Sequence, residues 1–188
     1  PGTVVFLFQP AEEGGLKAPI WGARLMIQEG ALSNPRPAAI FALHVTTTQP
    51  VGTVSYAENA ASAASDKAVI TIIGKRAHGA YPYQGVDAVA VASQCISALQ
   101  AIRSRRIAPQ QAALFSIGTI HGGDRRNVIA ERVSLEGTVR TFDADVRKSY
   151  ANMIRQTLDG CTSAMGASYE LDYREGYASM QNDPALLR

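Results

Sequence analysis

The sequence predicts an α/β protein in two parts. A partial parallel sheet of βαββ order is expected in residues 1–58, and a ferredoxin-like βαββαβ unit in residues 66–176. Two short apolar runs, 4–8 and 38–44, flank a stretch with helical spacing, as buried parallel strands joined by a crossover helix do. A segment of small residues at 59–65 is typical of a hinge between domains, and the order of strands and helices changes after it.

Composition places the chain among globular proteins. Its 188 residues, 46% hydrophobic and 18% charged, are enough for one domain or slightly more. A net charge of +2 argues against a nucleic-acid partner, because proteins that bind nucleic acid normally carry a concentrated basic face. No apolar run approaches the roughly 18 residues of a membrane span. The two cysteines, Cys95 and Cys161, are too few for a disulfide framework or a Cys-rich zinc site.

The chain begins abruptly. Pro1, Gly2 and Thr3 lead directly into an apolar run, with neither Met nor a basic leader nor a signal-type segment. We therefore expect an internal piece of a larger protein. Unpaired cysteines and the lack of a leader favour a cytoplasmic location, although such a start can conceal a signal peptide upstream.

In the first part, strands are expected at residues 4–8, 38–44 and 53–56. A helix is expected at 21–30, where Trp21, Leu25 and Met26 share a face and Gly30 can end it. In the second part, the expected elements are strand 67–73, helix 85–104, strands 112–121 and 133–142, helix 145–165 with Asp143 or Asp145 as its N-cap, and strand 168–175. Residues 177–188 are expected to return to the first part.

An acidic pair follows the first strand, in the segment Gln9-Pro10-Ala11-Glu12-Glu13-Gly14-Gly15. Open α/β sheets place active sites at such strand ends. Adjacent carboxylates in a turn point in different directions, so one can bind a cation while the other handles a proton. The alternative is a helix start, where acidic residues are favoured.

A histidine ends the next apolar run. His44 follows Phe41-Ala42-Leu43 at the same expected sheet edge, where a neutral imidazole can ligate a metal. It can equally be a satisfied core histidine. Glu13 and His44 would converge if the two strands are neighbours.

Two further candidates lie in loops of the second part. His78 stands between Ala77 and Gly79, and a solvated loop histidine is the alternative to a functional one. Asn127, after Gly122-Gly123-Asp124, and Arg140 could bind an anion, since Arg holds carboxylates bidentately. A plain hairpin explains the glycines equally well. His121 has no clear partner and is expected to be structural.

Together these segments resemble the metal-dependent amidohydrolases and metallopeptidases of clan MH, which include hippurate hydrolase, N-acyl-amino-acid amidohydrolase (bacterial aminoacylase) and the plant auxin-conjugate hydrolases. The matching segments run in family order over nearly the whole chain: Phe8-Gln9-Pro10-Ala11-Glu12-Glu13-Gly14, Gly22-Ala23-Arg24, Glu29-Gly30-Ala31-Leu32, Ile40-Phe41-Ala42-Leu43-His44, Gly74-Lys75-Arg76-Ala77-His78-Gly79-Ala80-Tyr81-Pro82, Gly123 with Asn127-Val128-Ile129, and Gly137-Thr138-Val139-Arg140-Thr141-Phe142.

The resemblance implies a role for each candidate. Glu12 matches the general base that takes a proton from a metal-bound water, and Glu13 and His44 match metal ligands. His78 matches a histidine that enters the neighbouring subunit's active site and stabilises the oxyanion. The remaining two, Asn127 and Arg140, match positions that hold the substrate's carboxylate. The second part matches a lid and dimerisation domain inserted into the catalytic domain.

The implied reaction is hydrolysis of the amide bond of N-acyl amino acids, hippurate-like or other conjugates, by a homodimer. Two divalent ions about 3.5–4 Å apart would polarise the carbonyl. Zinc, manganese, nickel or cobalt would suit imidazole and carboxylate ligands.

The chain departs from the family in its ligands. The family has a ligand segment upstream of the acidic pair and a final histidine near its far end, and these 188 residues contain neither. Catalytic zinc sites use three protein ligands, so we expect the 188 residues alone to bind metal weakly and to be inactive, with the parent protein as the enzyme.

Two other functions remain open at this stage. βαββαβ units also serve as non-catalytic dimerisation or amino-acid-sensing modules, which would need neither the acidic pair nor His44. An RNA-binding module would need stacked aromatic residues on the sheet, and the strand at 136–141 has none.

Overall fold

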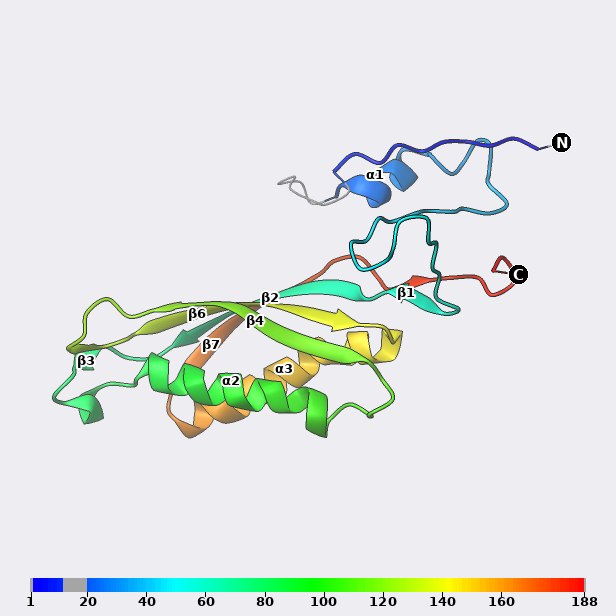
Figure 1. Ribbon diagram of the computed structural model, residues 1–188. Coiled ribbons are helices and arrows are strands. Elements are labelled where there is room, and N and C mark those ends of the chain that lie inside the picture. Colours follow the sequence, from blue (N-terminus) through cyan, green and yellow to red (C-terminus); the bar gives the residue numbers. More distant parts are fainter. Residues whose placement is uncertain (1, 12–19, 188) are drawn as a thin grey trace. The chain divides into compact units, whose positions relative to one another are not determined.

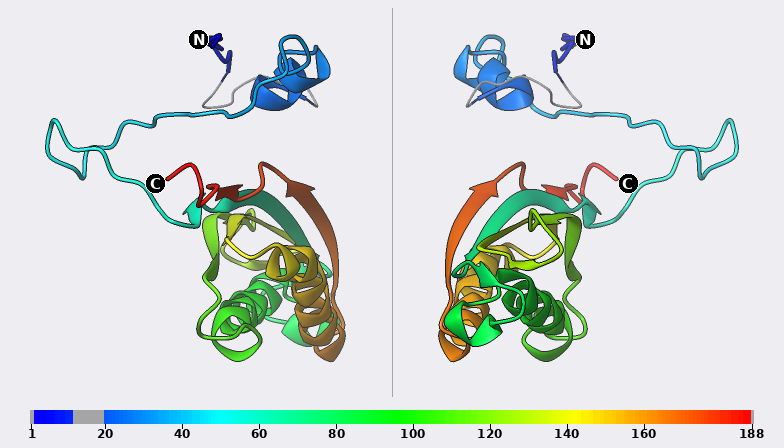
Figure 2. Two further views of the ribbon diagram at one scale, coloured as in Figure 1. Left: turned by 90° about the vertical axis from the view of Figure 1, so that its right-hand side faces the viewer. Right: turned by 90° about the vertical axis from the view of Figure 1, so that its left-hand side faces the viewer.

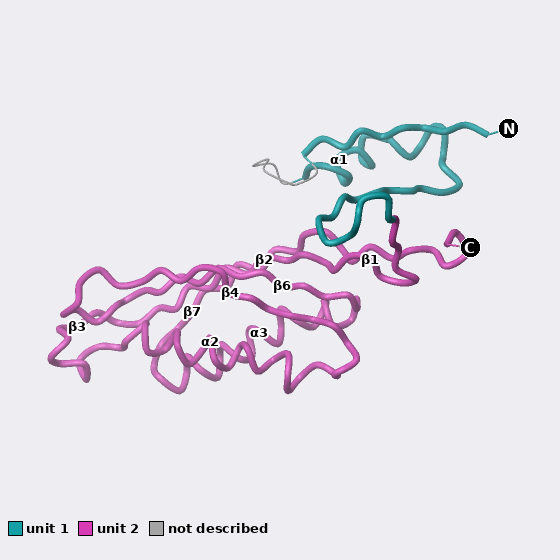
Figure 3. The backbone as a smooth tube through the Cα atoms, in the orientation of Figure 1, with its two compact units in different colours: residues 1–53 teal, residues 54–188 magenta. Residues whose placement is uncertain are grey.

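The computed structural model describes residues 2–11 and 20–187. The chain forms two compact units, residues 1–53 and residues 54–188, which are coloured separately in Figure 3.

The second unit is built on a four-stranded antiparallel sheet (Figure 1). Its strands lie in the order β4-β6-β2-β7 and are β2 (Ala64–Ile73), β4 (Ala113–Gly122), β6 (Arg132–Thr141) and β7 (Ser168–Glu175). The long β6 and β2 are central, and each is paired on both sides. The edges of the sheet are therefore β4 and β7.

Two helices cover one face of this sheet, α2 (Ala88–Arg105) and α3 (Ala144–Ala164), as Figure 2 shows. Each begins at an aspartate whose carboxylate accepts backbone N–H groups of the first turn. Asp87 accepts those of Val89 and Ala90, and Asp143 those of Asp145 and Val146. No helix among the described residues combines the length and the apolar character that crossing a membrane requires.

The core lies between the sheet and the helices. Alternate residues of β2 are fully buried, and they meet the apolar faces of the two helices. The largest fully buried side chains include Ile70, Ile72, Leu99, Ile102, Leu135, Tyr150, Ile154 and Leu158. All six elements expected between residues 66 and 176 are present, with ends that differ by three residues or fewer.

The expected hinge at 59–65 is largely extended structure. β1 (Ala60–Ser62) pairs with β8 (Met180–Gln181), and residues 64–65 already belong to β2. The Ser65 N–H donates to the carbonyl oxygen of Tyr177 at 3.0 Å. The segments directly before and after the sheet thus pair with each other as a two-stranded ribbon. This ribbon belongs to the second unit, so β8 of the 177–188 segment lies in that unit.

The first unit differs from the sequence prediction. Among its described residues there is one helix, α1 (Gly22–Gln28), which follows Trp21 and ends before Gly30 at φ +89°. The βαββ prediction is not met, because no residue in 2–11 or 20–58 is in a strand. An apolar run becomes a strand only when another strand accepts its backbone hydrogen bonds. The described residues supply none, and Phe8, Phe41 and Leu43 are exposed.

The two cysteines lie on the packed helices, and we predict that they differ in reactivity. Cys95 is fully buried on α2, and Cys161 on α3 is partly exposed. Burial, together with neighbouring Cys161, raises the pKa of the Cys95 thiol to about 12. At pH 8 iodoacetamide should therefore modify Cys161 well before Cys95, as followed by peptide mass spectrometry. In urea the two rates should converge, and equal rates in the folded protein would contradict this burial.

Candidate functional site

A two-stranded ribbon brings His78 and Asn127 together. β3 (Ala77–His78) pairs with β5 (Val128–Ile129), and His78 lies opposite Val128. The next N–H, that of Gly79, donates to the carbonyl oxygen of Asn127 at 2.8 Å. A Cβ at Gly79 would lie only 3.1 Å from that oxygen, so glycine permits this approach. Two predicted site residues that are 49 positions apart in the sequence thus share one end of the second unit.

The loop that carries His78 is closed by hydrogen bonds. Lys75 and Val86 exchange two backbone hydrogen bonds of 2.9 Å. Between them the chain forms β3 and a short 3₁₀ helix, η1 (Pro82–Gln84). The Tyr81 N–H donates to the carbonyl oxygen of His78 at 2.8 Å. His78 is therefore exposed on a loop whose backbone is held at both ends.

Hydrogen bonding selects the tautomer of His78. Its Nδ1 accepts the N–H of Ala80 at 3.1 Å. In a neutral imidazole the other nitrogen then carries the proton. His78 consequently presents Nε2–H as a donor, which is what stabilisation of a developing oxyanion requires.

Tyr81 adjoins His78, and Tyr83 adjoins Tyr81, neither of which was predicted to have a role. The ring centroids of His78 and Tyr81 are 5.7 Å apart with their planes tilted by 46°. Tyr83 meets Tyr81 edge-on at 6.3 Å. Tyr81 is 50% exposed and Tyr83 79% exposed. The position of Tyr81 three residues after a candidate histidine, within the quoted segment that ends at Pro82, is the sequence feature that could have indicated it.

Arg140 lies at the other end of the sheet. It is exposed on β6, opposite Ser65 and Leu114, eight positions beyond Arg132. At about 3.3 Å per residue, this separates it from the start of β6 by roughly 26 Å. Because Val139 faces the helices, Arg140 belongs to the opposite, uncovered face. One chain therefore does not bring Arg140 to His78 and Asn127.

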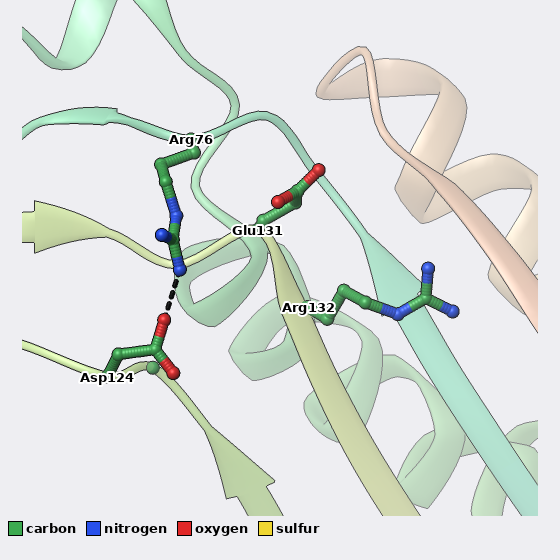
Figure 4. A pocket seen from close by; sticks show the side chains of 5 residues that line it. Arg76, Asp124, Glu131 and Arg132 are labelled. Atoms are coloured by element: carbon green, nitrogen blue, oxygen red, sulfur yellow. Dashed lines mark hydrogen bonds and ion pairs between the residues drawn. The ribbon is translucent and has the colours of Figure 1, made fainter.

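A shallow cavity of about 260 Å³ lies beside the His78 loop, lined by Arg76, Gly123, Asp124, Glu131 and Arg132. Figure 4 shows Arg76 and Asp124 pointing toward one another, and they form an ion pair. Arg132 pairs with Glu170 at 3.1 Å. Both guanidinium groups that line the cavity thus pair with a carboxylate, Arg76 with Asp124 of the lining and Arg132 with Glu170 outside it.

The predicted metal ligands are only partly described. Glu13 lies outside the described residues, and so does Glu12, the predicted general base. His44, in the first unit, is exposed, and its Nδ1–H donates to the carbonyl oxygen of Val45 at 2.6 Å. Its Nε2 then holds the lone pair that a metal would use. Within 2–11 and 20–187, no three His, Cys, Asp or Glu side chains form a group that could hold an ion, so the described residues do not by themselves fit a metal centre.

His121 stands apart from the other histidines. It is exposed on β4, opposite Ser134. Its structural role stays a prediction.

A buried ion pair at the far end of the sheet was not anticipated. Asp66 is 2% exposed and receives two hydrogen bonds from Arg147, at 2.6 and 3.1 Å. Tyr173 and the Gly176 N–H also donate to it, each at 3.0 Å. Burial acts to raise the pKa of Asp66, but these hydrogen bonds together hold it below its ordinary value. No local pattern reveals the pair, because Asp66 and Arg147 are 81 positions apart.

Part of the second unit matches a known protein domain. Residues 61–160, which include His78, Asn127 and Arg140, match the peptidase dimerisation domain of the M20 family. The chain therefore belongs to the M20 peptidase family, which confirms the resemblance drawn from its motifs.

Relatives and solved structures agree with this assignment. The N-acetyldiaminopimelate deacetylase of a Geobacillus species is 36% identical over 97% of the chain and 47% of its own length. The N-acetylcysteine deacetylase of Bacillus subtilis is 37% identical over 99% of the chain and 47% of its own length. A dinuclear metal-binding peptidase of the M20 family, the Bacillus subtilis YXEP protein, has a TM-score of 0.73 and 33% identity over 96% of the chain and 43% of its own. The chain thus spans about half the length of the relatives it matches.

Proposed function

We propose that the whole protein containing these residues hydrolyses the amide bond of N-acyl amino acids as a metal-dependent homodimer. The observation that carries this proposal is the meeting of His78 and Asn127, with His78 in the tautomer that donates from Nε2. Membership of the M20 family and likeness to relatives named as deacetylases support it.

Each residue has one task in this proposal. Glu12 accepts the proton of the attacking water and passes it to the leaving amine. His78 donates from Nε2 to the oxygen that becomes negative. The substrate's carboxylate is bound by Asn127 and Arg140, by an amide N–H and a guanidinium.

A bound divalent ion would polarise the carbonyl and lower the pKa of water. We propose Glu13 and His44 as two of its ligands. The tautomer of His44 suits this role, because Nδ1–H is engaged and Nε2 holds the lone pair. The opposite tautomers of His44 and His78 thus match two different tasks, ligation and donation.

The separation of Arg140 from His78 favours a site shared between subunits. The carbonyl oxygen and the carboxylate of an N-acyl amino acid lie within one or two residue lengths, roughly 4–7 Å. Arg140 is about 26 Å from the His78 end of the sheet along β6. A single substrate can contact both only if they come from two copies of the chain. We propose that the second unit is a ferredoxin-like lid that dimerises along the exposed edge β4, with α2 beside it.

We predict that Glu12→Gln in the whole protein, loaded with Zn²⁺ or Mn²⁺, abolishes most turnover of N-acyl amino acids. Gln cannot accept a proton, and positioned general bases contribute about 10²- to 10⁴-fold. Glu29→Gln is the matched control, because Glu29 is an exposed residue directly after α1. The 188 residues alone should be inactive for want of further ligands.

Steady-state assays that follow release of the free amine measure turnover in the wild type, in Glu12→Gln and in Glu29→Gln. Full activity in Glu12→Gln would contradict the general-base role. A loaded whole protein that turns over no N-acyl amino acid would instead favour a non-catalytic dimerisation or amino-acid-sensing module.

A further inference from the structure

We propose that Cys95 and Cys161 form a site of reversible oxidation, at which hydrogen peroxide converts the two thiols into a disulfide that joins α2 to α3. Both cysteines are free thiols in this structure. The inference concerns a modification of the second unit and does not depend on the proposed function.

The first step is that the two helices lie side by side and run antiparallel (Figure 2). β2 and β4 both pair antiparallel with β6, so they point the same way, and α2, which connects them, runs the opposite way. β6 and β7 both pair antiparallel with β2, so α3, which connects them, runs opposite to both. A residue late in α3 therefore lies beside a residue in the first half of α2.

The second step is that the two cysteines lie at about the same level of this helix pair. Arg106, directly after α2, donates to the carbonyl oxygen of Met153 on α3 at 3.4 Å. At 1.5 Å per residue, Cys95 lies roughly 16 Å back along α2 from Arg106, and Cys161 roughly 12 Å forward along α3 from Met153. The difference is shorter than an arginine side chain. Both cysteines pack in the same core, and their thiols are neighbours.

The third step is the close approach that a disulfide requires. Its two Cα atoms are usually about 4.4–6.8 Å apart. On α2, the buried residues three and seven positions before Cys95 are Ala92 and Ala88. Small side chains at a helix contact shorten the distance between the helix axes, so the sequence of α2 favours a short separation at this level.

The different exposure of the two thiols sets the order of the reaction. Cys161 is partly exposed, so its thiolate sulfur can attack hydrogen peroxide, and an S–O bond forms as the O–O bond breaks and hydroxide leaves. The fully buried Cys95 then attacks the sulfur of this sulfenic acid. The S–S bond forms, and the hydroxide that leaves takes the Cys95 proton. In total the thiols lose two electrons and two protons, and one peroxide becomes two waters.

Burial makes the second of these reactions the slower one. It raises the pKa of the Cys95 thiol to about 12, and the thiolate is the attacking form. The sulfenic acid of Cys161 should therefore accumulate before the disulfide closes, and dimedone should trap it.

The experiment treats the reduced whole protein, in its native state, with a small molar excess of hydrogen peroxide. Remaining thiols are alkylated in urea, and unreduced tryptic peptides are identified by mass spectrometry. We expect a cross-linked pair of peptides that contain Cys95 and Cys161, which dithiothreitol separates. Peroxide added in urea should give much less of this pair, because the two residues are 66 positions apart in the sequence.

Single variants test the order of the two reactions. In Cys95→Ala, oxidation should stop at the sulfenic acid of Cys161, which dimedone labels. In Cys161→Ala, Cys95 should remain a thiol, because peroxide does not reach it. Circular dichroism checks folding, and Cys95→Val replaces the Ala variant if that one unfolds.

Failure to find the Cys95–Cys161 pair in the wild type overturns the proposal, whether Cys161 proceeds to a sulfinic acid, links to the Cys161 of a second copy or stays reduced. Equal oxidation of Cys95 in the wild type and in Cys161→Ala overturns it too. Neither result bears on the proposed function, which assigns no task to either cysteine.

Discussion

Replacing His78 with Ala in the whole protein is expected to lower kcat for N-acyl amino acids about 100- to 1,000-fold, because loss of one oxyanion donor typically has that effect. KM should change much less, since the donor acts on charge that develops only in the transition state. The proposed donor is the Nε2–H that remains when Nδ1 accepts the Ala80 N–H. Steady-state kinetics on the metal-loaded protein measures both parameters.

His121→Ala is the matched control. His121 is also an exposed histidine of the second unit, but it lies on β4 rather than in the His78 loop. Its removal should leave kcat nearly unchanged. Equal losses in the two variants would contradict a specific role for His78.

Mixing variants tests whether His78 acts in the neighbouring subunit. Glu12→Gln supplies an intact His78, and His78→Ala supplies an intact Glu12. If the site is shared, random exchange of subunits should restore about one quarter of wild-type activity, because half of the dimers are mixed and each has one intact site. If both residues act within one chain, mixing restores nothing. The recovery should appear only after subunit exchange, which size-exclusion chromatography of a tagged variant can follow.

The largest effect on stability is expected from Asp66→Ala. Its carboxylate is fully buried, and the side chain of Arg147 is only 13% exposed. Removing one partner leaves the other charge buried without compensation, which typically lowers the free energy of unfolding by about 3–5 kcal/mol. Tyr173 and the Gly176 N–H lose an acceptor at the same time. Urea unfolding followed by circular dichroism measures the loss.

The adjacent residue supplies the control. Lys67 forms an exposed pair with Glu136 at 2.7 Å, and both side chains are about half exposed. Such surface pairs contribute about 0–1 kcal/mol, so Lys67→Ala should alter stability little. A comparable loss in the two variants would show that burial of the Asp66–Arg147 pair is not what matters.

Low pH should remove the stabilisation that the Asp66–Arg147 interaction contributes. The folded-state pKa of Asp66 is below its ordinary value, so the unfolded chain binds the proton more readily and stability rises with pH in that range. The contribution is fully present above the ordinary aspartate pKa of about 3.9 and is lost as pH falls through the lower folded value. The difference in unfolding free energy between wild type and Asp66→Asn should therefore shrink below about pH 4. A constant difference down to pH 2 would contradict this.

Strands and helices were predicted correctly from the sequence where the local spacing of hydrophobic residues indicates the type of element. In the second unit, β2 buries every second residue and α2 buries one face, so hydrophobic spacing alone located both. The expected cap of α3 was either Asp143 or Asp145, and the structure selects Asp143. Before residue 58 the same reasoning indicated strands that the described residues 2–11 and 20–58 do not form, because an apolar run says nothing about whether a partner strand is available.

The sequence by itself determined the family, through motifs that hold His78, Asn127 and Arg140, and the order of elements in the second unit. Only the tertiary structure decided which of these residues meet. It joined His78 to Asn127 through β3 and β5, kept Arg140 at the opposite end of β6, and buried Asp66 against Arg147. Backbone pairing and buried ion pairs link residues far apart in the chain, and their partners are set by three-dimensional packing, which no local pattern of residues records.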